Sequence, residues 1–152
     1  MPNGNLEIGR ATQRLQAAYG YWRSKCTADR LPGRADIEPG EMVPFLANVV
    51  LLDVLRDPLD FRYRLMGTAV EAHMLRRYTG EIMSTIEHQR PPSRIWSDFE
   101  MVVVRRLPVL TDVPYVGPHR DFLRVQHVIL PLAADGTRVD MVLSVVDFIP
   151  KE

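Results

Sequence analysis

The chain has 152 residues, 46% of them hydrophobic and 25% charged, which is the composition of an ordinary soluble globular protein with one core. Nineteen basic residues balance nineteen acidic ones, so no global field attracts the chain to nucleic acid or to an acidic membrane. The apolar runs are too short to cross a bilayer, and no membrane insertion is expected.

The first predicted element is an amphipathic helix over residues 7–27. Apolar residues from Ile8 to Cys26 recur there at steps of three and four. A stripe with this much aromatic surface needs a cover, which is either the chain's own domain or a second copy of the chain. The candidate dimer contacts on this stripe are Leu15, Tyr19 and Trp22.

Two strands follow an extended connection over residues 31–39, in which prolines and a glycine break regular structure. A short helical turn is expected over residues 41–46. Residues 48–55 predict a strand with apolar side chains on both faces. In residues 61–66 apolar and basic side chains alternate, which indicates a strand with two unlike faces.

The period changes at Gly67 from that of a strand to that of a helix. Thr68 and Glu71 form the Thr-x-x-Glu pattern of a capping box at the helix start, and Gly80 is well placed to end the helix. His73 shares this helix with two arginines and lies off its apolar stripe, so we expect a surface histidine at a boundary or exposed position.

The rest of the chain predicts one longer helix and three strands. The helix covers residues 93–106, and the strands cover residues 108–115, 122–133 and 138–149. Asp135–Gly136 between two apolar runs is a typical hairpin turn. This element order predicts an α+β fold with one antiparallel sheet and helices grouped on one face. Because several strands are apolar on both sides, the N-terminal helix is expected to cover the second face.

Several ordered motifs resemble a family of small bacterial PAS-like proteins, the fifth PAS-fold family. Residues 31–83 contain LPGRADIEP, FRYRLMGT and a closing TG, and residues 107–143 contain LPVL and VILPLAADGTRVDMVL. Gly40 departs from the family at a position that is often apolar, which affects the start of the short helical turn. The resemblance implies a PAS-like five-stranded antiparallel sheet with helices on one face, and a role in sensing, regulation or protein interaction, often as a stand-alone domain.

On this interpretation, residues 1–30 hold a helix for packing or dimerisation and residues 31–152 form a PAS-like domain. Aromatic and methionine side chains between sheet and helices would contact a small apolar or aromatic ligand, and a mid-strand histidine would serve as a polar anchor. The candidate pocket residues are Tyr63, Leu65, Met74, Tyr78, Trp96, Phe99, Met101 and His127. Plain core packing is the alternative interpretation for each of them.

The resemblance brings no shared catalytic residue and no obligate cofactor, so we expect a regulatory domain and not an enzyme. The rival hypothesis is a small cone-shaped enzyme related to ketosteroid isomerase, in which Asp53 or Asp112 would form an acid–base pair with His127. No ligand spacing resembles a metal site, and Cys26, as the only cysteine, fits a reducing cytoplasm. The expected partners are a second copy, an unidentified signalling protein, or both.

Overall fold

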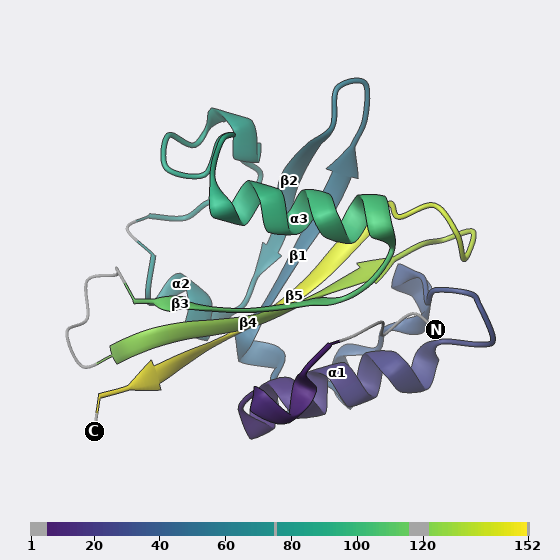
Figure 1. Ribbon diagram of the computed structural model, residues 1–152, viewed down its shortest axis with the longest axis horizontal. Helices are drawn as coiled ribbons and strands as arrows, with labels where there is room; N and C mark the ends of the chain where they lie inside the picture. Colours follow the sequence, from purple (N-terminus) through teal and green to yellow (C-terminus); the bar gives the residue numbers. More distant parts are fainter. Residues whose placement is uncertain (1–5, 75, 116–121, 152) are drawn as a thin grey trace.

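A computed structural model of the chain describes residues 6–74, 76–115 and 122–151, which form an α+β fold around one antiparallel sheet. The five strands are arranged in the order β2-β1-β5-β4-β3 (Figure 1). They are β1 (Val49–Leu55), β2 (Asp60–Met66), β3 (Val109–Pro114), β4 (Phe122–Leu132) and β5 (Met141–Pro150). The helices of the described part are α1 (Gln13–Lys25), α2 (Thr68–Glu71) and α3 (Arg94–Arg105).

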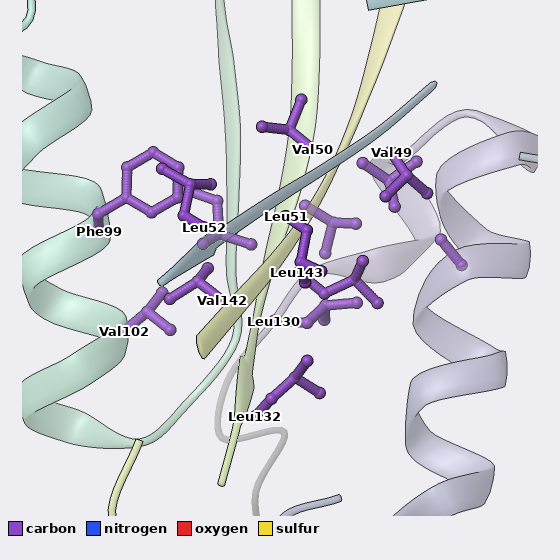
Figure 2. Packing of buried hydrophobic residues seen from close by; sticks show 14 of the residues in the cluster. Val49, Val50, Leu51, Leu52, Phe99, Val102, Leu130, Leu132, Val142 and Leu143 are labelled. Carbon is purple, nitrogen blue, oxygen red and sulfur yellow. The ribbon is translucent and has the colours of Figure 1, made fainter. Parts of the chain in front are cut away.

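Helices cover both faces of the sheet, as predicted. We call the face under α3 the inner face and the face under α1 the outer face (Figure 1). Leu52 and Val142 are directed toward α3, whereas Leu51 and Leu143 point to the opposite side (Figure 2). Burial on both faces explains why the central parts of these strands are almost continuously apolar, since Val49–Leu52 of β1 and Val142–Val145 of β5 are all buried.

Helix α1 is shorter than predicted because Thr12 caps it. The Thr12 hydroxyl accepts a hydrogen bond from the backbone N–H of Leu15, and residues Ile8–Arg10 form a separate 3-10 turn before it. Two further 3-10 turns, Pro39–Glu41 and Leu46–Asn48, bracket the segment in which a helical turn was expected. The predicted bounds of α3 are confirmed to within one residue, with Ser93 as its N-cap.

The turn after β2 differs from its prediction. Helix α2 has a single turn with Gly67 as its N-cap, so Thr68 occupies the first helical position and no side chain caps the helix. The expected capping box is therefore wrong, and Glu71 instead forms an ion pair with Arg77 at 3.1 Å. Gly80 does not end this helix. It has a φ of +90° and lies in a turn beside β2.

The hairpin between β4 and β5 is confirmed. The Asp135 carboxylate accepts hydrogen bonds from the backbone N–H groups of Thr137 and Arg138, both at 2.8 Å. Gly136 has a φ of +84°, a conformation that glycine adopts without strain. These contacts also lower the pKa of the Asp135 carboxyl, with the backbone hydrogen bonds as the main cause.

Candidate functional site

Strand register brings three polar side chains to the inner face. Thr111 of β3 lies directly opposite His127 of β4, and His127 in turn lies opposite Val146 of β5. Ser144, two residues before Val146, shares this face, and its hydroxyl oxygen lies 3.4 Å from His127 Nδ1. Thr111 and Ser144 are buried, whereas His127 is half-buried. The result is a polar row within an otherwise apolar layer, which we call the Thr111–His127–Ser144 row.

The imidazole of His127 is neutral at physiological pH. Burial lowers its pKa from an ordinary 6.5 to about 4, and the nearby positive charge of Arg94 acts in the same direction. A neutral imidazole carries one donor and one acceptor nitrogen, and at 3.4 Å the contact with Ser144 is at most a weak hydrogen bond. This face therefore holds hydrogen-bonding capacity that the described residues leave largely unused.

Thr111 adds to that capacity. Its side-chain oxygen is buried. Among the buried side-chain nitrogen and oxygen atoms of the described residues, it alone has no hydrogen-bond partner. Buried hydroxyls are normally paired, because an unpaired one loses its bonds to water without replacement. The Thr111–His127–Ser144 row was only partly predicted from the sequence. The position of His127 was expected, whereas Thr111 and Ser144 could have been found only from the strand register.

An aromatic cluster occupies one end of the inner face. The ring of His73 stacks on Phe148, with centroids 3.7 Å apart and an interplanar angle of 21°, and His73 Nδ1 lies 3.0 Å from the Tyr115 hydroxyl. Phe122 meets the same imidazole edge to face at 4.8 Å. His73 is half-buried, which agrees with the boundary position that was expected as one alternative, but these aromatic contacts were not predicted. Its three aromatic partners come from strand ends far away in the sequence, so local periodicity cannot indicate them.

The predicted pocket residues separate into three groups. Tyr63, Tyr78, Trp96 and Phe99 are buried, and Met74 and His127 are half-buried. Leu65 and Met101 are 45% and 38% exposed, so the expectation that they lie between sheet and helices is wrong. Burial does not test whether any of these side chains contacts a ligand, and that role stays a prediction.

A β-bulge explains the position of Leu65. Leu51 pairs with Leu65 and Leu52 pairs with Tyr63, which leaves Arg64 as an extra residue on β2. One extra residue reverses the alternation of side chains beyond it. Leu65 therefore points to the outer face, where it lines a small apolar pocket of about 50 Å³ together with Pro39. Tyr63 stays on the inner face, and its hydroxyl donates to the buried amide oxygen of Gln89 at 2.5 Å.

Neither carboxylate proposed for an acid–base pair lies on the same face as His127. Asp112 lies opposite Gln126 on the outer face and forms an ion pair with Arg124 at 2.9 Å. Asp53 shares the outer face with Leu51 by strand alternation and pairs with Arg64 at 3.0 Å. The geometry required by the rival enzyme hypothesis is therefore not formed by these residues.

The apolar stripe of α1 packs on the chain's own sheet. Leu15, Tyr19 and Trp22 are buried, and the indole N–H of Trp22 donates to the backbone carbonyl of Pro131 at 2.9 Å. The packing prediction is confirmed. A dimer contact through these side chains stays a prediction, and it would require α1 to leave the sheet.

A polar network fastens the start of α1 to the outer face, and sequence reasoning missed it. The Gln126 amide accepts from the Thr12 backbone N–H at 2.9 Å and donates to the Arg10 carbonyl at 3.0 Å. Arg14 forms an ion pair with the buried carboxylate of Asp147 at 2.6 Å. Gln126 immediately precedes His127, so neighbouring residues of β4 contact α1 on one face and the polar row on the other.

Comparison with known proteins assigns the chain to a family. A family model described as a PAS domain matches residues 10–146. The chain belongs to the PAS domain family. The motif resemblance noted in the sequence is thereby confirmed. No curated protein matches this PAS domain.

Two solved structures are similar to this PAS domain. The PAS domain is similar to a sensory box sensor histidine kinase from Vibrio cholerae, with 12% identity, a TM-score of 0.52, and coverage of 74% of this chain and 90% of that chain. A fungal LOV domain photoreceptor is also similar, with 17% identity, a TM-score of 0.45, and coverage of 68% and 76%. At such identities the likeness concerns the fold.

Within residues 6–74, 76–115 and 122–151, no helix has the length and hydropathy needed to cross a membrane. Within the same ranges, no three His, Cys, Asp or Glu side chains gather closely enough to hold a metal ion.

Proposed function

We propose that this PAS domain is a cytoplasmic, non-enzymatic regulatory sensor whose inner face binds a small uncharged ligand. The observation that carries the proposal is the Thr111–His127–Ser144 row, two buried polar groups and a half-buried one with unused hydrogen-bonding capacity. The neutral state of His127 favours a ligand without charge, because its nitrogens then offer a donor and an acceptor and no ionic attraction. The surrounding apolar side chains favour a ligand with an apolar or aromatic body.

A route for signalling follows from the two faces of β4. Ligand contact at His127 would change the position of β4, and Gln126 beside it holds the N-terminal end of α1 through two hydrogen bonds. Occupancy would then shift the balance between two arrangements of α1 on the sheet, and a second copy or a downstream signalling protein would recognise one of them. An adaptor without a ligand is the alternative role within the same family.

Native mass spectrometry of freshly purified protein tests the ligand. We expect additional mass that is lost on denaturation, with an absorption spectrum taken on the same sample to characterise it. The excess mass should fall strongly in the variant His127→Leu and persist in His88→Leu, a matched control at an exposed histidine. A bare polypeptide mass for the wild-type protein in every preparation would contradict ligand sensing and favour the adaptor.

A further inference from the structure

A cleft of about 580 Å³ lies on the outer face, beside the N-terminal end of α1. Glu7 and Arg10 line it from the segment before α1, and Asp112 and Arg124 line it from β3 and β4. A volume of this size falls within the range of small-molecule sites. The cleft is separate from the ligand site proposed above, because the side chains of the Thr111–His127–Ser144 row lie on the other face of the sheet.

The four charged side chains of the cleft form two ion pairs, one on each wall. Arg10 Nη1 lies 3.1 Å from Glu7 Oε2, and Arg124 Nη1 lies 2.9 Å from Asp112 Oδ2. Each pair is joined through one guanidinium nitrogen, although a guanidinium can bind a carboxylate through two parallel bonds. Exposed ion pairs of this kind contribute little to stability, so their charged groups can turn to a ligand at small cost.

Asp112 has the clearest unused capacity in the cleft. Its Oδ2 atom accepts from Arg124 and, at 3.3 Å, from the side-chain amide of Gln126. No described residue donates a hydrogen bond to its Oδ1 atom. A carboxylate oxygen in this state readily accepts from an ammonium group, and the remaining guanidinium nitrogens of Arg124 are donors for a second carboxylate. One ion pair therefore presents an acceptor and a donor of opposite charge side by side.

We propose that this cleft binds a free α-amino acid with an apolar side chain. The ammonium and carboxylate groups of an α-amino acid are attached to one carbon atom, so they lie close together, as the charges of Asp112 and Arg124 do. The ammonium group donates to Asp112 and the carboxylate accepts from Arg124, which aligns two opposite charge pairs head to tail. The two arginines and two acidic residues of the cleft sum to zero charge, which favours a zwitterion over a ligand with net charge.

Two leucines supply the apolar part of the site. Leu6 and Leu110 are half-buried and line the same cleft, one on each wall. An apolar side chain of the amino acid that packs between them removes further apolar surface from water. The inference is independent of the proposed function, because it uses no side chain of the Thr111–His127–Ser144 row.

Matched probes test the need for both charges. L-Leucine carries both, isocaproate has the same body without the ammonium group, and isoamylamine has it without the carboxylate. We expect the full chain to bind L-leucine at least about tenfold more tightly than either analogue, because each analogue loses a charge-assisted hydrogen bond. Proton–nitrogen NMR titrations measure all three dissociation constants, and the side-chain amide signal of Gln126 reports on the cleft. Glycine, which lacks the apolar side chain, should bind more weakly than L-leucine, and equal binding would contradict the role of Leu6 and Leu110.

Variants locate the site. Asp112→Asn preserves the size of the side chain and removes its charge, so it should weaken L-leucine binding about tenfold or more. Asp53→Asn is the matched control, because Asp53 also pairs with an arginine on a neighbouring strand, and it should bind as the wild type does. His127→Leu should also retain binding, and well-dispersed NMR spectra confirm that each variant is folded.

Two results would overturn the proposal. Binding that persists in Asp112→Asn and disappears in His127→Leu would place the amino acid on the inner face. The absence of any shift in the wild-type spectrum with L-leucine, L-methionine and L-phenylalanine would show that the cleft holds no apolar amino acid. Neither result decides whether the inner face binds its own uncharged ligand, since native mass spectrometry tests that separately.

Discussion

At the scale of single residues, His127 shows how burial decides the chemistry of a side chain. A histidine at the surface would gain a proton near pH 6.5, and its charge would vary within the physiological range. The position of His127 on the inner face, with the positive charge of Arg94 nearby, lowers its pKa to about 4. The folded protein therefore holds a constant, neutral hydrogen-bonding group there, and binding through it should not vary between pH 6 and 8.

The same pKa shift predicts how stability depends on pH. Above about pH 6.5, His127 is neutral in both the folded and the unfolded chain and contributes no pH dependence. As the pH falls from 6.5 toward 4, the unfolded chain binds a proton that the folded chain does not bind, so stability decreases. This difference between the folded and unfolded pKa of His127 lowers the free energy of unfolding by an amount on the order of 3 kcal/mol, once the pH has fallen below both pKa values.

Urea denaturation between pH 7.5 and 4.5 measures this effect. The free energy of unfolding of the wild type should fall more steeply over this range than that of His127→Gln, in which no group titrates at this position. His88→Gln, at an exposed histidine, serves as the matched control and should retain the wild-type slope. Equal slopes for the wild type and His127→Gln would show that the folded protein protonates this imidazole normally.

At the scale of elements, Gly67 marks the junction of β2 and α2 for a reason other than backbone freedom. Its φ of −66° is open to any residue, but a Cβ atom there would lie 2.2 Å from the carbonyl oxygen of Ala47. That oxygen belongs to the backbone and cannot move as the end of a flexible side chain can. The close approach between two segments therefore requires glycine at this position.

Two identical substitutions should then have opposite effects. Gly67→Ala should destabilise the fold by about 3 kcal/mol, in the upper range for overpacking, because backbone must shift to admit the methyl group. Gly20→Ala lies on the exposed side of α1 with nothing within 4 Å of the new methyl group, and should stabilise the protein by about 1 kcal/mol. Chemical denaturation of both variants measures the difference. A neutral Gly67→Ala would contradict the close approach to Ala47.

The features that could be predicted from the sequence are those that depend on residues close together in the chain. Periodicity located α3 and the five strands, the Asp135–Gly136 pair located the hairpin, and the motifs identified the family and with it a five-stranded antiparallel sheet. The failures share a different cause. Thr68 and Glu71 have the residue types of a capping box, but the helix starts one residue earlier, with Gly67 as its N-cap and close to the backbone of Ala47.

The candidate site was less predictable because it depends on pairing between distant strands. Periodicity placed His127 on an apolar face, but Thr111 became its neighbour only through the register of β3 with β4. Leu65 was assigned to the wrong face, since a single extra residue at Arg64 reverses the alternation. The aromatic contacts of His73 were missed because its partners follow at least forty residues later in the chain. No local pattern contains this information.

At the scale of the whole molecule, the sheet is one layer with a tryptophan buried on each face. Trp22 of α1 lies on the outer face, and Trp96 of α3 lies on the inner face against Phe61. The strands between them contribute side chains to both sides, so each helix packs on the same backbone (Figure 2). Both helices contact β4, so removing either one would expose apolar side chains of that strand. This arrangement argues that residues 1–30 and 31–152 do not unfold as separate units.

Single-tryptophan variants test this cooperativity. The variant Trp96→Phe keeps only Trp22, whose fluorescence reports on the outer face. The variant Trp22→Phe keeps only Trp96, whose fluorescence reports on the inner face. Within each variant, we expect the urea transition followed by tryptophan fluorescence to coincide with the transition followed by far-UV circular dichroism, as for one two-state domain. If the Trp22 signal changes at a lower urea concentration than the dichroism, α1 leaves the sheet before the rest unfolds. That outcome would contradict a single cooperative unit, and it would support α1 as the element that moves when the inner face is occupied, because such elements have low local stability.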